Sequence, residues 1–359
     1  MELSQEDALR LHVLTTECEA IRIDESRMEI RALLDGEERS MRLKPNCRDD
    51  VYLRAVRELL SERALNSPGG YPVYISRWTR MGQLDSQRMA ALLKLGEPEA
   101  VVAVASSQGV DAEIARLAWW CHPTIEVARF LMESPRLDNT EIANDIGRFL
   151  LEFLPFEEAA IHVATSTRLL LLRNQLDEAA RTGLWRRGQR KTSILLGFIQ
   201  ATPLALHSYV TTLSTGPDAG ISADNTSAPE LEALEQLGRE PLKALLLTIE
   251  KVLQKPADQD IVVGCLHGLA TPLLPFRPRL NEEFASISQI KHAAGMKPGE
   301  HEAPAHKLLH ALRFLSLCDE PLVRGFFAQS SSVGTLMRKQ LEPILSPVIR
   351  MLQRAASRL

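Results

Sequence analysis

The spacing of apolar and polar residues changes along this chain, from strict alternation near the N-terminus to helical spacing in the rest. Ile21–Asp24 and Met28–Leu33 alternate apolar with charged residues, a pattern typical of half-buried strands. Asp35–Gly36 follows them as a turn signal. Tyr71–Trp78 alternates in the same way. We therefore expect these three segments to form a three-stranded sheet.

Two helices should accompany this sheet. Ser4 and Asp7 have the spacing of a capping box and open an apolar helical segment. A second helix should begin at Asn46 or Asp49, either of which is a good N-cap residue. Its apolar face consists of Tyr52, Val56, Leu59 and Leu60. Residues 1–83 are therefore predicted to form a small α+β domain.

Short apolar segments with helical spacing begin at about Asp85. Glycines and prolines separate them, and good N-cap residues precede several of them. The predicted N-caps are Asp111, Thr124 and residues 138–140. Consecutive short helices with tight connections are typical of helix pairs stacked in series, as in HEAT or armadillo proteins. The internal similarity is weak, so we describe residues 84–213 as an irregular helical array.

The C-terminal part is predicted to be helical after a break. Residues 214–228 are rich in Ser, Thr, Gly, Asp and Asn, which favours a flexible linker or a long loop. Ser227 and Glu230 then open a helix whose 3.6-residue pattern continues through Leu253. Residues 229–359 form the C-terminal helical region. Its expected breaks are at Pro256, Pro272, Pro275, Pro321 and Pro343. The predicted fold class is thus mainly α, with a small N-terminal α+β unit followed by a large, irregular, HEAT/armadillo-like helical array.

Composition and charge narrow the range of functions. The chain has 359 residues, 45% of them hydrophobic, which is typical of globular proteins and long for a single core. Its 42 basic and 46 acidic residues exclude a chain-wide attraction to nucleic acid or anionic membrane, although a local patch stays possible. The acidic Met1–Asp7 segment does not have the order of a signal peptide, and no apolar run approaches the ~20 residues of a membrane span. We therefore expect a cytoplasmic protein without membrane insertion.

The cysteines agree with a reducing compartment. They are odd in number, scattered, and include no C-x-x-C pair. The five are Cys18, Cys47, Cys121, Cys265 and Cys318. Reduced thiols in a cytosol are the simpler interpretation than a disulfide framework.

A family resemblance begins in the segment that is densest in special residues. It is carried by Asn46–Asp50, Ser67–Tyr74, Arg77–Gln83, Gly96–Val101 and Leu151–Glu158. Over about the first 160 residues the chain resembles the S protein encoded with the reverse-acting dissimilatory sulfite reductase (Dsr) system of sulfur-oxidising bacteria. The resemblance implies a cytoplasmic factor that influences sulfur oxidation. Control of gene expression is one level at which such a factor would act. The resemblance supplies no chemical mechanism.

Cys47 is the one candidate for thiol chemistry. It stands beside Arg48 at the predicted start of a helix, where a cation and the helix dipole lower a thiol pKa. Asp49 and Asp50 act in the opposite direction, and the sequence shows neither a partner cysteine nor a base nearby. A sulfur-carrying thiol and a partly buried cysteine near a helix cap are the two interpretations.

A metal site is conceivable at a histidine group. His306 and His310 are four residues apart, which places both imidazoles on one helix face, and His301 or Glu302 would add a third ligand. Pro304 lies between them, and the pair lacks the Glu of an H-E-x-x-H motif. Surface histidines on an amphipathic helix are commoner, so we expect neither a metal nor another cofactor.

A basic cluster gives the sharpest surface hypothesis. Within eleven positions it comprises Arg181, Trp185, Arg186, Arg187, Arg190 and Lys191. Arginines for phosphate and an indole for base stacking are typical of RNA or single-stranded DNA binding. The same cations suit an acidic protein partner, and a solvated turn between helices is the third interpretation. Replacing Arg186 and Arg187 by alanine should abolish weak, salt-sensitive polyanion binding and leave the melting temperature nearly unchanged.

Three further features near these segments are weaker signals. Gly69–Gly70 lies in no phosphate-binding motif and is better explained as a turn before a strand. Arg77, Trp78 and Arg80 offer a possible face for a partner. Trp119–Cys121 should fill the space between helices.

The sequence contains no convergent acid, base, nucleophile or phosphate motif, so catalysis is less expected than binding. Helical arrays commonly serve as binding scaffolds. We therefore expect a non-catalytic interaction or regulatory protein with a partner in the sulfur-oxidation machinery. A sulfur carrier acting through Cys47 and an RNA-binding regulator using residues 181–191 are the alternatives.

Overall fold

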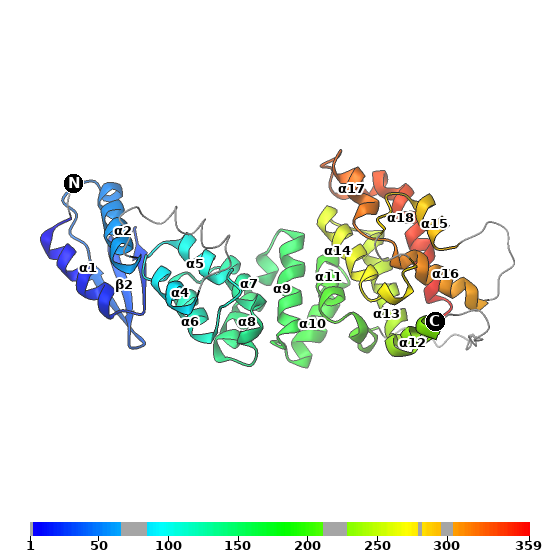
Figure 1. The fold of residues 1–359 in the computed structure, drawn as a ribbon, viewed down its shortest axis with the longest axis horizontal. Coiled ribbons are helices and arrows are strands. Elements are labelled where there is room, and N and C mark those ends of the chain that lie inside the picture. Colours follow the sequence, from blue (N-terminus) through cyan, green and yellow to red (C-terminus); the bar gives the residue numbers. More distant parts are fainter. Residues whose placement is uncertain (1–2, 66–84, 211–227, 279–281, 296–303) are drawn as a thin grey trace. The chain divides into compact units, whose positions relative to one another are not determined.

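The computed structural model of the chain describes residues 3–65, 85–210, 228–278, 282–295 and 304–359 (Figure 1). The described part is mainly helical, with one small sheet near the N-terminus, which confirms the predicted fold class. The chain divides into two compact units, an N-terminal unit, Met1–Phe153, and a C-terminal unit, Leu154–Leu359. The predicted boundary near residue 83 and residues 214–227 of the predicted linker 214–228 lie outside the described residues, while Ala228, its last residue, begins a helix.

The sheet of the N-terminal unit is an antiparallel meander in the order β1-β2-β3. Its strands are β1 (Ala20–Asp24), β2 (Glu29–Leu34) and β3 (Glu37–Arg42). The first two strands confirm the predicted alternation, with Ile23 paired to Ile30. The third strand differs from the expectation, because Glu37–Arg42 takes the place expected for Tyr71–Trp78, which lies outside the described residues.

A two-residue turn sets the register of the third strand. Asp35 and Gly36 both have positive φ, 48° and 79°, as a tight hairpin turn requires. Leu34 therefore pairs with Glu37, and the ladder continues from there. All but one of the β3 residues are exposed, so the strand has no alternation of apolar and polar residues by which the sequence would reveal it.

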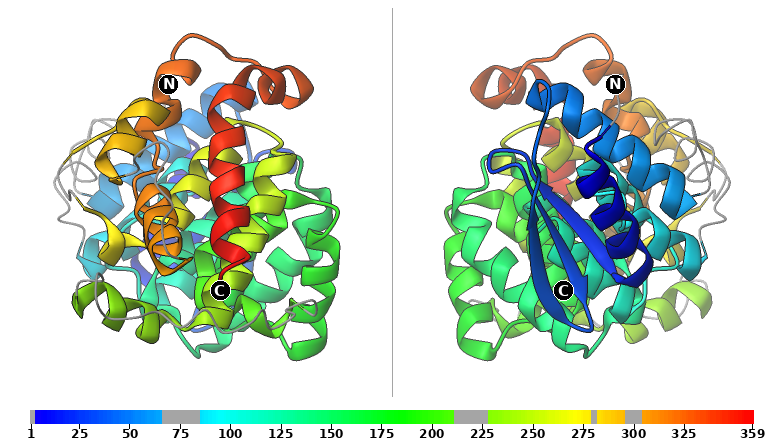
Figure 2. Two further views of the ribbon diagram at one scale, coloured as in Figure 1. Left: turned by 90° about the vertical axis from the view of Figure 1, so that its right-hand side faces the viewer. Right: turned by 90° about the vertical axis from the view of Figure 1, so that its left-hand side faces the viewer.

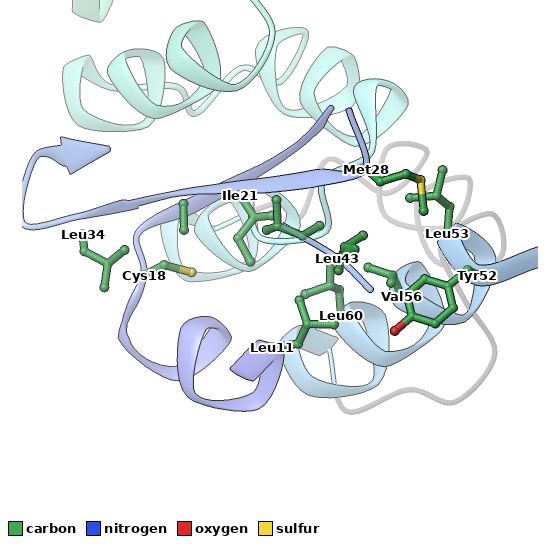
Figure 3. Packing of buried hydrophobic residues seen from close by; sticks show 12 residues of the cluster. Leu11, Cys18, Ile21, Met28, Leu34, Leu43, Tyr52, Leu53, Val56 and Leu60 are labelled. Atoms are coloured by element: carbon green, nitrogen blue, oxygen red, sulfur yellow. The ribbon is translucent and has the colours of Figure 1, made fainter. Parts of the chain in front are cut away.

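Two helices, α1 (Gln5–Glu17) and α2 (Asp49–Leu65), cover one face of this sheet (Figures 2 and 3). Apolar side chains from both helices and from the strands meet between them. The cluster includes Leu11, Ile21, Ile30, Tyr52, Val56 and Leu60, each at most 1% exposed. The predicted apolar face of the second helix thus forms the core of the sheet region.

A buried carboxylate joins the two helices to the chain segment after β3. Asp7 is fully buried, and its Oδ2 accepts hydrogen bonds from the Tyr52 hydroxyl at 2.5 Å and from the Lys44 backbone N–H at 2.8 Å. Ser4 caps α1 by accepting from the Asp7 N–H at 3.2 Å. The Ser4 cap is therefore confirmed, while the Asp7 carboxylate serves tertiary structure.

The outer edge of β1 is closed by the segment between α4 (Ser86–Leu92) and α5 (Pro98–Ala105). The Ile21 N–H donates to the Leu93 carbonyl at 2.9 Å, and Arg22 forms an isolated parallel bridge with Gly96. Gly96 has φ +66°, and a Cβ there would lie 2.6 Å from Cγ1 of Ile23. Only glycine fits this close approach, which protects the sheet edge.

Three more helices complete the N-terminal unit: α6 (Ala112–Cys121), α7 (Ile125–Glu133) and α8 (Glu141–Phe153). A short 3-10 turn, η1 (Pro135–Leu137), precedes α8. The predicted N-caps are confirmed, since Asp111, Thr124 and Thr140 accept from the backbone N–H three residues later. Trp119 packs edge-on against Phe149 of α8 at 4.9 Å, as expected for an indole between helices.

The C-terminal unit is helical throughout its described residues. It begins with η2 (Leu154–Phe156), α9 (Ala160–Leu172), α10 (Glu178–Gly188), α11 (Thr192–Ala201) and η3 (Pro203–Ser208). It continues with α12 (Ala228–Leu237), α13 (Arg239–Gln254), α14 (Gln259–Ala270), η5 (Leu274–Phe276), α15 (Ile287–Ala293), α16 (Pro304–Ser316), α17 (Pro321–Phe327) and α18 (Gly334–Ala356). The last helix packs against α13 and α16.

Close apolar packing joins α9 to α11. A Cβ added at Gly197 would lie 2.5 Å from Cβ of Thr167 and 2.7 Å from the Ala164 carbonyl oxygen. The two helix backbones therefore approach more closely than any residue with a side chain at position 197 permits.

Two expected helix boundaries were wrong. The helix predicted from Ser227 through Leu253 is divided at Gly238, whose φ of +74° is incompatible with a continuous helix. The break predicted at Pro343 does not occur, because α18 continues through Pro343 and Pro347. Its buried stripe of Met337, Leu341, Leu345, Val348 and Leu352 keeps the helix in register across both prolines.

Candidate functional site

The predicted basic cluster lies on α10 and on the connection from it to α11. Asp177 caps α10 by accepting from the Ala180 N–H at 2.7 Å. Arg186 and Arg187 lie in the last turn, where the negative end of the helix dipole favours cations. Arg190 and Lys191 follow immediately in the sequence. The cluster is thus attached to an ordered helix end.

Two of its cations have structural partners. The Arg181 guanidinium donates to Oδ1 of Asn174 at 2.9 Å and to the Leu176 carbonyl at 3.4 Å. The Lys191 ammonium donates to the Glu157 carbonyl at 3.0 Å. These two side chains hold the ends of α10 to neighbouring segments.

The other three cations of the cluster have no side-chain partner within the described part of the chain. Arg186, Arg187 and Arg190 are exposed, and their side chains form no hydrogen bond or ion pair with any residue that the structure describes. We call these three residues the α10 basic surface. Their charges remain available to a partner in solution.

Trp185 departs from the expectation of an exposed stacking platform. The indole is only 8% exposed and lies edge-on to Phe198 at 5.1 Å. It also stacks on Tyr209 at 5.2 Å with an interplanar angle of 29°. Helical spacing explains this, because Leu184, Trp185 and Gly188 face α11 while the neighbouring arginines face away. The indole therefore exposes little surface on which a base from solution could stack.

A cavity of about 600 Å³ lies beside the buried indole. It is lined from three directions, by α10, by the end of η3 with the two residues after it, and by α13, together with Leu195. The α10 residues are Glu178, Thr182, Trp185, Arg186 and Gln189; the others are Ser208, Tyr209, Val210, Leu247, Thr248 and Lys251. Its size lies in the range of pockets for small organic molecules.

The sequence carried no signal for this cavity. Trp185 and Arg186 were singled out as a surface, whereas Tyr209 and Lys251 are distant in sequence and belong to no motif. Only the tertiary arrangement of α10, α13 and the η3 end brings these side chains to one cavity.

Cys47 is the one cysteine that is not buried. It packs at the margin of the sheet core, and its thiol contacts the Arg48 carbonyl, with an Sγ–O distance of 3.7 Å. The Arg48 guanidinium turns to the Asp50 carboxylate, 3.1 Å away. The nearest cation in sequence is therefore already engaged by an acid.

The other four thiols are buried. Burial raises the pKa of Cys18 to about 11 and that of Cys121 to about 12. The pKa values of Cys265 and Cys318 are raised as well, because both thiols are removed from solvent. These four cysteines are held in the thiol form at neutral pH.

The candidate partner face at residues 77–80 and the candidate metal-binding histidines lie mostly outside the described residues. Arg77, Trp78, Arg80 and His301 lie outside the described residues, and the side chain of His306 is not among those described. His310 is half-buried on α16. No group of three or more His, Cys, Asp or Glu side chains in the described ranges is arranged to hold a metal ion.

None of the described helices combines the length and apolar character that a membrane span needs. Comparison of the chain with protein-family models, curated proteins and solved structures finds no match.

Proposed function

We propose that this chain is a non-catalytic binding protein of the cytoplasm, which recognises an acidic protein partner through the α10 basic surface. The observation that carries the proposal is the state of Arg186, Arg187 and Arg190, which are exposed and without a partner among the described residues. Arginine is well suited to such recognition, because its planar guanidinium binds carboxylates in a bidentate manner.

The net charge of the chain makes a local surface important. At −4 the whole chain repels a polyanion, so attraction has to come from a place where cations are concentrated. Three arginines fall within five positions, so they concentrate positive charge over a short stretch of backbone, comparable in length with the Debye length of ~8 Å at physiological salt. Binding of this kind steers association and falls as salt rises.

An acidic protein is favoured over RNA. Sequence-tolerant binding of single-stranded nucleic acid depends on aromatic side chains on which bases stack. The indole of this cluster is stacked on Tyr209 and mostly withdrawn from solvent, so the α10 basic surface offers charge without a stacking platform.

The cellular setting of the proposal comes from the resemblance to the S protein of the Dsr gene cluster. On this resemblance we propose that the partner is a component of dissimilatory sulfur oxidation and that the chain is an interaction or regulatory factor of that system. The absence of any acid–base or nucleophile arrangement at the α10 basic surface agrees with binding as its role.

Affinity capture from a sulfur-oxidising host tests this proposal. Three baits are compared: wild type, an α10 variant and a matched control. The α10 variant carries Arg187→Ala and Arg190→Ala. The matched control carries Arg350→Ala and Arg354→Ala, at two exposed arginines of α18. Wild type and the matched variant should recover the same Dsr-system component, with and without nuclease, and the α10 variant should lose it. Recovery that nuclease abolishes supports the RNA-binding alternative, and equal recovery by all three baits contradicts the α10 basic surface.

A sulfur carrier acting through Cys47 is the second candidate, since that thiol alone among the five is not buried. Alkylation at neutral pH with intact-mass readout separates the two. We expect one label at Cys47, absent in Cys47→Ser, at the rate of an ordinary free thiol such as glutathione. Labelling far faster than glutathione supports the carrier and contradicts a purely non-catalytic role.

A further inference from the structure

The cavity beside α10 is lined by apolar, cationic, acidic and hydroxyl-bearing side chains, and the proposed function does not require a ligand there. Part of its lining is apolar, formed by Trp185, Leu195 and Leu247. Trp185 and Leu195 are buried, and the indole is held in place by its contacts with Phe198 and Tyr209. An aromatic ligand body therefore meets fixed aromatic and aliphatic surface.

The cations gather at one end of this cavity. The Lys251 ammonium donates to Oε1 of Gln189, which lies three residues after Arg186 and hence on the same side of the helix end. This bond uses one of the three ammonium donors, and the Arg186 guanidinium has no partner among the described residues. Both cations thus retain donors for an anionic group.

The acid of the cavity lies at the opposite end. Glu178 begins α10, and the eight residues to Arg186 correspond to about 12 Å along a helix. At this separation the carboxylate does not neutralise the cation in solvent at physiological salt. An anion bound near Arg186 and Lys251 is therefore repelled only weakly by Glu178.

Two of the hydroxyl groups that line the cavity, those of Ser208 and Thr248, favour a hydrogen-bond donor on the ligand. Thr248 donates its proton to the Ala244 carbonyl at 2.7 Å, and Ser208 donates to the Ala205 carbonyl at 2.7 Å. Each of these two oxygens then has only acceptor capacity left toward the cavity. A ligand N–H or O–H group satisfies that capacity.

From these features we infer that the cavity binds a small aromatic anion, with its anionic group at Arg186 and Lys251, its rings along Trp185 and a hydrogen-bond donor toward the hydroxyl groups. This inference does not rest on the proposed function, because Arg187 and Arg190 do not line the cavity. A partner protein on the α10 basic surface and a small ligand in the cavity are separate binding events that share only Arg186.

Two fluorescent probes of nearly the same shape test this assignment on the full-length protein. The anion 8-anilinonaphthalene-1-sulfonate has naphthalene rings, an N–H donor and a sulfonate, whereas N-phenyl-1-naphthylamine lacks only the sulfonate. We expect one saturable site for the anion, confirmed by calorimetric stoichiometry, and at least about tenfold weaker binding of the neutral probe.

Adjacent arginines supply a matched pair of variants. Arg186→Met should weaken binding of the anionic probe about tenfold, as should Lys251→Met, because each removes one charged contact. Arg187→Met changes the charge equally and lies outside the cavity, so its affinity should stay within about twofold of wild type. Circular dichroism checks that each variant is folded. If Lys251→Met unfolds, the comparison of Arg186→Met with Arg187→Met is sufficient, because Arg186 is exposed and its replacement should not disturb the fold.

Three results overturn the assignment. The first is equal affinity of wild type for the charged and the neutral probe. The second is a loss in Arg187→Met as large as that in Arg186→Met, which indicates a general surface charge effect. The third is the lack of a saturable site in folded wild-type protein.

Discussion

Selected arginines from the two units of this protein illustrate two different uses of a positive charge. In the N-terminal unit, cations tie elements together: Arg22 of β1 binds Glu38 of β3 at 2.7 Å, and Arg116 of α6 binds Glu19 before β1. In the C-terminal unit, the α10 basic surface is turned outward without a described partner. Cations that bridge elements serve the fold, whereas exposed, unpaired cations on an ordered helix are available for recognition.

The contrast holds within the C-terminal unit as well. Arg313 of α16 forms two hydrogen bonds with Glu230 of α12, at 2.7 and 2.8 Å, and Glu230 is buried. This arginine joins two helices as those of the N-terminal unit join strands and helices. The C-terminal unit thus contains both bridging arginines, such as Arg313, and exposed arginines without a described partner, such as those of the α10 basic surface.

The largest effect should come from breaking the buried polar contact of the N-terminal unit. Asp7→Ala leaves the Lys44 N–H without its acceptor and leaves the Tyr52 hydroxyl with only the longer contact to Oγ of Ser4, at 3.2 Å. We expect a loss of about 3 kcal/mol in the free energy of unfolding. Glu17→Ala, at an exposed position of the same helix, should stay within about 0.5 kcal/mol. Denaturant unfolding curves measure the free energy of unfolding of both variants. Equal losses would show that the Asp7 hydrogen bonds contribute no more to stability than an exposed side chain does.

Adding a side chain at Gly197 in the C-terminal unit should cause a smaller loss in the free energy of unfolding. At this position α9 and α11 are in close contact. Gly197→Ala forces a methyl group against Thr167 and the Ala164 carbonyl, and should cost about 2 kcal/mol. Gly183→Ala on α10 meets nothing within 4 Å and should be neutral or stabilising by up to about 1 kcal/mol. A Gly197→Ala protein as stable as wild type would refute the close approach of α9 and α11.

Some features of the fold were predictable from the sequence and others were not. Local signals carried the caps at Ser4, Asp111, Thr124 and Thr140, the Asp35–Gly36 turn and the first two strands, because each depends on neighbours within a few residues. The third strand escaped because its residues are exposed and do not alternate. Gly197 carried no signal, since its reason lies on another helix.

The candidate site divides in the same way. The clustered arginines were visible in the sequence, because charge density is local. The burial of Trp185 and the cavity beside it depend on Tyr209 and Lys251, which only tertiary packing brings near. Sequence patterns therefore located the charges of the site, and the fold determined which groups accompany them.

An effect near 1 kcal/mol is expected at Tyr52, and it should depend on pH. Burial, and then the hydrogen bond to Asp7, raise the pKa of Tyr52, so the folded protein retains the phenol proton to higher pH than the unfolded chain. The corresponding stability is present below about pH 10 and is lost as the pH rises through the raised pKa. Tyr52→Phe should cost about 1 kcal/mol at neutral pH and flatten this alkaline decline.

Unfolding free energies measured from pH 8 to pH 11 check this prediction. Tyr209→Phe is a suitable comparison, because its ring is stacked on Trp185 and no described hydrogen bond holds its hydroxyl. An alkaline decline that is unchanged in Tyr52→Phe would show that another group controls stability in this range.

The smallest effect on stability should come from the α10 basic surface, and it tests the central claim most directly. Binding of poly-L-glutamate is measured across a salt series, with melting curves alongside, for wild type, Arg186→Ala/Arg187→Ala and the matched Arg350→Ala/Arg354→Ala. The first double variant should bind at least about tenfold more weakly at low salt and change the free energy of unfolding by no more than about 0.5 kcal/mol, while the matched variant binds like wild type. Unfolding of the Arg186/Arg187 variant, or equal binding by both double variants, would contradict a free recognition surface on α10.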